Sequence, residues 1–304
     1  MPPTRLALVA LATLALTAGA QARNPRAELI VAPAWLAQHL KDPDLVLLHV
    51  GDRGEYDKAH IAGARYVGQR DVSFSSMDHD KGLMLELPPA DSLRSRLAAL
   101  GISDRSRIVV YYGGDWVSPA TRILFTLDHA GFGDRSALLD GGMNAWKDAG
   151  LPLTAEISPS KSGQLSALEV KPLVVSLDYV KANLGAKNFH LVDGRAAVFY
   201  DGVEEGNNRK GHIPGARSIP FTEIADDKLR LRSTTELTKL FRDAGIGPKD
   251  TVVAYCHIGQ QATAVLFAAR TLGNPVLLFD GSFQEWGRRT DLPVENPADG
   301  KQKP

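Results

Sequence analysis

The sequence predicts an α/β protein made of two copies of one unit, each with a mainly parallel sheet flanked by helices. Short apolar runs alternate with segments whose apolar residues recur at helical spacing, and this alternation is typical of parallel sheets covered by helices. Similar segments also recur in the same order in both halves of the chain. The 304 residues suit two domains of roughly 150 residues each.

The first residues have the pattern of a secretory signal peptide. Arg5 precedes an apolar run from Leu6 to Ala18, and a small-x-small triplet ends at Ala22. We therefore expect residues 1–22 to direct export, to a bacterial periplasm, and to be cleaved after Ala22. A retained membrane anchor is the alternative, disfavoured because the run is short for a membrane-spanning helix.

The expected elements follow in order along both halves. Runs typical of buried strands span Leu45–Val50, Ile108–Tyr112, Ala137–Leu139, Phe189–Val192, Val252–Tyr255 and Val276–Phe279. Helical spacing covers Asp91–Leu100, Thr121–Ala130, Thr234–Ala244 and Ala262–Leu272, and a glycine follows each of these segments. We expect an N-terminal domain over 23–152, a linker over 153–171 and a C-terminal domain over 172–304.

Repeated motifs identify the two halves as a duplication. The segment His-Ile-x-Gly-Ala begins at His60 and again at His212, an offset of 152 residues. Asp140-Gly141-Gly142 matches Asp280-Gly281-Ser282, and a tryptophan follows each triplet at the same spacing. Because the order is preserved while the offsets drift, the halves differ mainly in the lengths of their loops.

Cys256 is the sole cysteine of the chain. It ends a predicted strand, and five residues separate it from the helix expected to start at Ala262, so backbone N–H groups and the helix N-terminus favour a thiolate there. We expect the thiol pKa to fall below its free value of about 8.5. In the first copy Tyr112 stands at this position and the loop is two residues longer. These differences favour a reactive cysteine in the second copy over an inert buried one.

Together these motifs resemble the tandem-domain rhodaneses, the thiosulfate and 3-mercaptopyruvate sulfurtransferase family. The resemblance runs from about Leu29 to Val294 and includes Val192-Asp193-Gly194-Arg195 after a strand. It implies an inactive N-terminal domain, a catalytic C-terminal domain and a sulfur transfer in which Cys256 becomes a persulfide.

The resemblance also assigns roles to residues around the cysteine. Arg195 would bind the anionic group of the sulfur donor, and Asp193 would organise backbone or pair with a cation. The loop residues His257, Ile258, Gly259, Gln260 and Gln261 would stabilise the persulfide through their N–H groups. The side chain of His257 either adds positive charge or points to solvent. Arg209 is a second candidate anion contact, and His60 and His212 are expected to be structural.

Thiosulfate is the donor that the pattern favours, with cyanide or a thiol as acceptor. The loop is similar to the Cys-basic-Ile-Gly of bacterial thiosulfate enzymes, and Val198 and Phe199 lie where mercaptopyruvate enzymes carry a second arginine. 3-Mercaptopyruvate remains the alternative donor, and a relay protein that passes sulfur to a partner protein is a second alternative.

Other classes of protein fit less well. A cysteine phosphatase needs an arginine where Ala262 stands, and a disulfide oxidoreductase needs a second cysteine. The scattered histidines predict no metal site, and we expect no cofactor. The 35 basic and 35 acidic residues give no net charge, which does not favour nucleic acid or an anionic membrane as partner.

Overall fold

The computed structural model describes residues 24–78, 82–114, 116–157 and 161–301. The predicted signal segment, 1–22, lies outside these residues. Within the described ranges, no helix is both long enough and apolar enough to cross a membrane.

The first domain contains a five-stranded sheet in the order β1-β5-β4-β2-β3, and every pairing in it is parallel. Its strands are β1 (Ile30–Val31), β2 (Leu45–Val50), β3 (Arg65–Tyr66), β4 (Arg107–Tyr112) and β5 (Ser136–Leu139). Its helices are α1 (Pro25–Leu29), α2 (Pro33–His39), α3 (Arg53–Lys58), α4 (Ala90–Ala99), α5 (Ser118–Leu127) and α6 (Gly142–Asp148).

The second domain repeats this sheet in the equivalent order β6-β12-β11-β7-β10, again with parallel pairings. Its strands are β6 (Val174–Val175), β7 (Phe189–Asp193), β10 (Arg217–Ser218), β11 (Thr251–Tyr255) and β12 (Val276–Phe279), and β8 (Glu205–Gly206) and β9 (Arg209–Lys210) form a separate antiparallel pair. Its helices are α7 (Leu177–Asn183), α8 (Ala197–Tyr200), α9 (Thr234–Asp243), α10 (Ala262–Thr271), α11 (Ser282–Arg288) and α12 (Pro297–Lys301).

The predicted α/β architecture is confirmed, and the main differences lie at helix ends. The helix expected over Thr121–Ala130 is α5, which begins earlier, at Ser118, because Pro119 suits the first helical turn. It ends at Leu127, where a wider helical turn leads to Gly131 at a φ of +94°. A left-handed glycine commonly ends a helix, so taking Gly131 as the end signal placed the predicted end of this helix slightly too late.

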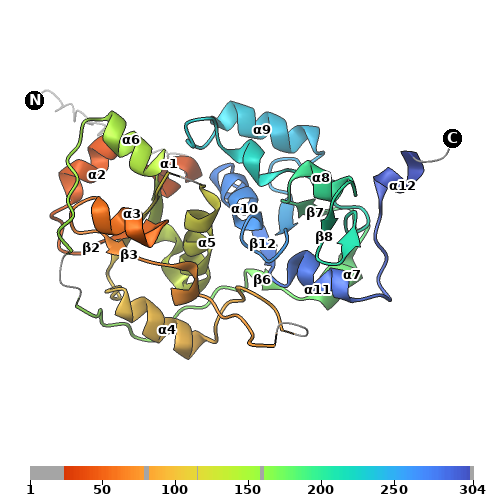
Figure 1. The fold of residues 1–304 in the computed structure, drawn as a ribbon, viewed down its shortest axis with the longest axis horizontal. Helices are drawn as coiled ribbons and strands as arrows, with labels where there is room; N and C mark the ends of the chain where they lie inside the picture. The colour runs from red at the N-terminus through yellow and green to blue at the C-terminus, as the bar shows by residue number, and fades with distance from the viewer. Residues whose placement is uncertain (1–23, 79–81, 115, 158–160, 302–304) are drawn as a thin grey trace, which may run out of the picture.

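The two domains lie side by side, with α5 and α10 between their sheets (Figure 1). Both helices are buried around most of their circumference, as expected for helices apolar on every side. Leu124 and Phe125 of α5 belong to the same hydrophobic core as Val265 and Leu266 of α10. Because this core is continuous across the domains, it holds them in one relative orientation.

Candidate active site

Cys256 directly follows β11, and its loop leads straight into α10. The backbone N–H groups of Ile258, Gly259, Gln261 and Ala262 are directed toward its sulfur and favour the thiolate. Gly259 makes this tight curve possible because its φ is +83°, a conformation that residues with a side chain rarely adopt. The arrangement stabilises negative charge on the sulfur atom.

The thiol itself is completely buried. Burial raises the pKa of Cys256 above its ordinary value, and the four N–H groups oppose this effect without cancelling it. The expected fall of the thiol pKa below about 8.5 is therefore wrong for this structure. The sequence indicates the N–H groups of the loop, but it does not reveal how fully the sulfur is removed from water.

Ser282 supports the cysteine from the following strand–helix turn, a role that the sequence analysis missed. The backbone N–H of Cys256 donates to the Ser282 Oγ at 3.1 Å, and that hydroxyl donates to the Phe279 carbonyl at 2.9 Å. Ser282 holds a φ of +54°, whereas the first copy has Gly142 at a φ of +53° in the equivalent place. A serine in a position suited to glycine was the available signal for this contact.

Arg195 follows β7, and its side chain is fully buried. Its Nε donates to both Asp193 carboxylate oxygens at 3.0 Å, and its Nη2 donates to Asp193 Oδ2 at 2.6 Å and to the Gly211 carbonyl at 2.8 Å. The guanidinium carbon lies 4.0 Å from the centre of the Phe283 ring. Asp193 thus pairs with a cation and also accepts the Arg195 backbone N–H at 2.9 Å.

The Nη1 group of Arg195 is buried without a hydrogen-bond partner among the described residues. A side chain at Gly206 would come within 3.0 Å of this nitrogen, so the glycine leaves space beside it. Although burial lowers the pKa of Arg195, its bonds to Asp193 and the nearby Cys256 sulfur raise it overall. A buried cation with an unpartnered N–H group beside a thiol is suited to an anionic ligand.

His257 is half-buried and packs edge-on against Phe199, with ring centres 4.6 Å apart. Burial, followed by the charge of Arg195, lowers its pKa to about 4. The imidazole is therefore neutral near pH 7, so the suggestion that it adds positive charge is wrong. Its backbone carbonyl accepts a hydrogen bond from Asn207 at 2.9 Å, which ties the β8–β9 hairpin to the loop.

The remaining loop side chains face the first domain or the protein interior. Gln260 Nε2 donates to Ser118 Oγ at 3.4 Å, and Gln260 lines a cavity of about 320 Å³ that Tyr66 and Trp116 also line. Gln261 Oε1 is buried without a hydrogen-bond partner in the described part of the chain, and Ile258 is half-buried.

Comparison with known proteins identifies the family. The model of the rhodanese-like domain matches twice, at residues 32–149 and 176–289. The chain belongs to the rhodanese-like family. The resemblance and the two-domain fold that the motifs predicted are confirmed.

Relatives named as sulfurtransferases align with this chain over most of their length. A thiosulfate sulfurtransferase of Azotobacter vinelandii is 32% identical over 271 residues, covering 88% of this chain and 97% of the relative. A 3-mercaptopyruvate sulfurtransferase of Escherichia coli K12 is 31% identical over 279 residues, covering 87% and 97%. The anaerobic ergothioneine biosynthesis enzyme of Chlorobium limicola shares the fold, with a TM-score of 0.78 at 22% identity over 90% of this chain and 71% of that one.

The two motif histidines have equivalent structural positions in the two rhodanese domains. His60 stacks on Tyr56 and bonds the Tyr56 carbonyl at 2.7 Å, while His212 stacks on Tyr200 and bonds the Tyr200 carbonyl at 2.8 Å. Both also form an antiparallel backbone bridge to a later segment, His60 with Thr154 and His212 with Glu295. This matched packing suits the structural role expected for them.

Arg209 does not join the other candidate residues. Its Nη1 donates to the Leu292 carbonyl at 2.7 Å and to the Arg289 carbonyl at 3.2 Å. These bonds hold the segment that follows α11. The suggestion of a second anion contact at Arg209 is not supported by this geometry.

Proposed function

We propose that this chain is a sulfurtransferase that moves sulfane sulfur from thiosulfate to cyanide or a thiol through a persulfide on Cys256. The observation that carries the proposal is the group of four backbone N–H donors aimed at the sulfur of Cys256. The unpartnered Nη1 of Arg195 supplies a cation for the donor. Relatives over most of the chain are named thiosulfate and 3-mercaptopyruvate sulfurtransferases.

The reaction divides into two half-reactions at the same atom. The Cys256 thiolate attacks the outer sulfur of thiosulfate, the S–S bond of the donor breaks, and sulfite leaves with the bonding electron pair. Cyanide then attacks the outer sulfur of the persulfide, thiocyanate leaves, and the thiolate is restored. The N–H donors stabilise the negative charge on sulfur in both half-reactions without moving.

Thiosulfate is favoured over 3-mercaptopyruvate by the groups that surround the donor site. Only the Nη1 group of the Arg195 guanidinium lacks a hydrogen-bond partner among the described residues, and Phe199 occupies the neighbourhood where a second arginine would bind a carboxylate. A compact anion needs fewer contacts than a keto acid, whose carboxylate is best held by a bidentate pair. We propose 3-mercaptopyruvate as the alternative donor.

Steady-state sulfur transfer to cyanide tests the proposal. Purified protein is compared with its Cys256→Ser variant, using thiosulfate and 3-mercaptopyruvate as separate donors. We expect turnover with thiosulfate that the variant lacks. Preference for 3-mercaptopyruvate would replace the donor and keep the mechanism. A single loading of sulfur without turnover would favour a relay to a partner protein, and full activity of the variant would reject Cys256 as nucleophile.

We also propose that the chain is exported to the periplasm after loss of residues 1–22. The proposal is supported by Arg5, the apolar run and the triplet that ends at Ala22. Fractionation of the native host tests it together with N-terminal sequencing of the recovered protein. Periplasmic protein that begins at Arg23 is expected, and full-length protein in the membrane fraction would support the retained anchor instead.

A further inference from the structure

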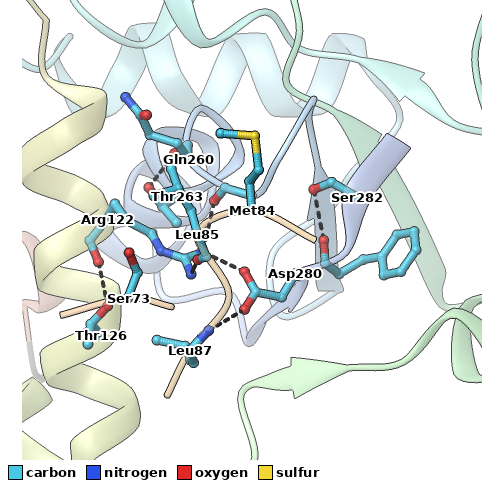
Figure 2. A network of polar contacts seen from close by, with 12 residues as sticks. Ser73, Met84, Leu85, Leu87, Arg122, Thr126, Gln260, Thr263, Asp280 and Ser282 are labelled. Atoms are coloured by element: carbon cyan, nitrogen blue, oxygen red, sulfur yellow. Dashed lines mark hydrogen bonds and ion pairs between the residues drawn. The ribbon is translucent and has the colours of Figure 1, made fainter. Parts of the chain in front are cut away.

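Arg122 reaches from the first domain into the Cys256 loop of the second. This residue lies on α5, and its side chain is 1% exposed. Its Nη1 donates to Asp280 Oδ1 at 2.6 Å and to the Gly259 carbonyl at 3.2 Å, and its Nη2 donates to the Leu85 carbonyl. Figure 2 shows the guanidinium directed at Asp280, with Leu87 on the other carboxylate oxygen.

The contact at Gly259 fixes the conformation of the loop. A Cβ at this glycine would lie 2.7 Å from Asp280 Oδ1 and 3.0 Å from Arg122 Nη1, so the backbone packs directly on the ion pair. The carbonyl of Gly259 points outward to Arg122, while the N–H groups of Gly259 and Gln261 point at the Cys256 sulfur. This carbonyl shares a planar peptide unit with the N–H of Gln260, between the two donors. Holding that unit in place restricts the backbone torsions on either side of it and so limits the directions of the Gly259 and Gln261 N–H groups.

The same ion pair supports the start of the loop. Asp280 begins the turn that leads to Ser282, whose hydroxyl accepts the backbone N–H of Cys256. The second oxygen of Asp280 accepts the N–H of Leu87 at 2.9 Å, a residue of the first domain. The Cys256 loop is therefore held at both Cys256 and Gly259 by groups connected to Arg122.

The internal repeat shows that the equivalent helix of the second copy has no arginine at the corresponding position. Thr121 and Thr263 occupy equivalent helix positions, and their hydroxyls meet at 3.0 Å between α5 and α10. The counterpart of Arg122 is therefore Ala264, which cannot reach the first copy's loop in the same way. Asp140, the counterpart of Asp280, accepts the N–H of Leu231 at 3.2 Å.

We propose that Arg122 is a positioning residue for sulfur transfer, which makes the first domain part of the catalytic unit although it carries no nucleophile. The inference rests on the proposed function insofar as it concerns turnover. Arg122 acts through Gly259 and Asp280: it orients the N–H donors and neutralises the carboxylate beside the loop.

The experiment compares Arg122→Met with Arg122→Lys and with a matched control, Arg270→Met. Arg270 also joins the domains through a buried carboxylate, at 3.0 Å from Asp128 Oδ2, but it lies in the last turn of α10, whereas the Cys256 loop enters the first. The readouts are the pH midpoint of Cys256 alkylation by iodoacetamide, kcat/KM for thiosulfate, and Tm. Alkylation reports on one site because the chain has one cysteine.

We expect Arg122→Met to raise the alkylation midpoint and to lower kcat/KM at least tenfold, because the donors lose alignment and Asp280 loses its cation. Arg122→Lys should recover part of both. Arg270→Met should lower Tm. It should leave the alkylation midpoint unchanged and kcat/KM within about twofold of the unaltered protein. Arg195, the cation that interacts with the Cys256 sulfur, is unchanged in every variant.

Equal midpoints and equal kcat/KM in the Arg122→Met and Arg270→Met variants would overturn the positioning role. Should Arg122→Met fail to fold, Arg122→Lys decides: an unchanged midpoint and an unchanged kcat/KM reject the role. Alkylation requires no sulfur donor. A shifted midpoint in a protein without sulfur transfer would therefore reject the proposed function while retaining Arg122 as the residue that positions the loop.

Discussion

Removing the charge of Arg195 should damage the reaction of the sulfur donor selectively. The simple change Arg195→Met would leave the fully buried Asp193 carboxylate unpaired, at a cost of about 3–5 kcal/mol in folding free energy. The double variant Asp193→Asn/Arg195→Gln avoids this cost, because two neutral amides can bond each other in the same place. This variant removes the cation without leaving a buried charge.

The magnitude follows from the hydrogen bonds of the guanidinium. Nε and Nη2 already bond Asp193 and Gly211, so Nη1 is the group left for the donor. One hydrogen bond to a charged group contributes about 1.5–3 kcal/mol. If it forms with the donor in the transition state, its loss lowers kcat/KM for thiosulfate by roughly 10- to 150-fold.

The assay uses the separate half-reactions of a double-displacement mechanism. Initial rates over a grid of thiosulfate and cyanide concentrations give kcat/KM for each substrate, while circular dichroism and Tm verify folding. We expect the value for thiosulfate to fall and that for cyanide to stay within about twofold, since cyanide meets a persulfide already formed. An unchanged thiosulfate value, or equal losses for both substrates, would refute the role of Arg195 in donor binding.

Three further predictions concern the cysteine and its surroundings. Ser282→Ala should lower the free energy of unfolding by about 1–3 kcal/mol, because the buried N–H of Cys256 loses its partner. Denaturant titration measures this free energy, and an unchanged value would contradict the contact. His257→Asn should leave the shape of the pH–rate profile unchanged between about pH 5.5 and 8, since the His257 pKa is about 4; loss of an ionisation in that range would show that His257 titrates there. The raised pKa of Cys256 contributes stability that is complete below the unfolded-state pKa and is lost as pH rises through the folded-state value. Above about pH 9 the Tm of the unaltered protein should therefore fall relative to that of Cys256→Ala. Parallel curves of Tm against pH would contradict the raised pKa.

Much of the fold was predictable because it depends on local patterns. The strands Leu45–Val50 and Val276–Phe279 have the predicted bounds, since a buried parallel strand is a short apolar run between polar turns. The helix start at Ala262 was also predicted, because apolar residues at helical spacing begin there. Repetition of the motifs then indicated a second sheet of the same order.

The features that the sequence did not reveal depend on contacts between distant segments. Arg122 and Asp280 are 158 residues apart, and nothing in either local pattern indicates that α5 faces the turn after β12. The direction of the Cys256 pKa likewise depends on burial, which results from packing of both domains around the loop. The bond from Arg209 to the Leu292 carbonyl is a further contact between distant segments that the local pattern around Arg209 does not indicate.

The duplication has produced two domains that hold each other in place. In the first copy Tyr112 replaces the cysteine, and its hydroxyl donates to the Leu229 carbonyl of the second domain at 2.5 Å. The domains also exchange equivalent bonds: the N–H of Leu87 donates to Asp280 of the second domain at 2.9 Å, and the N–H of Leu231 donates to Asp140 of the first at 3.2 Å. Leu85 and Leu229 both adopt positive φ, at +56° and +61°, so the segments that precede Leu87 and Leu231 share one strained conformation. The first domain has therefore kept the reciprocal contacts while losing the nucleophile, which is the outcome expected if its remaining task is to hold the Cys256 loop.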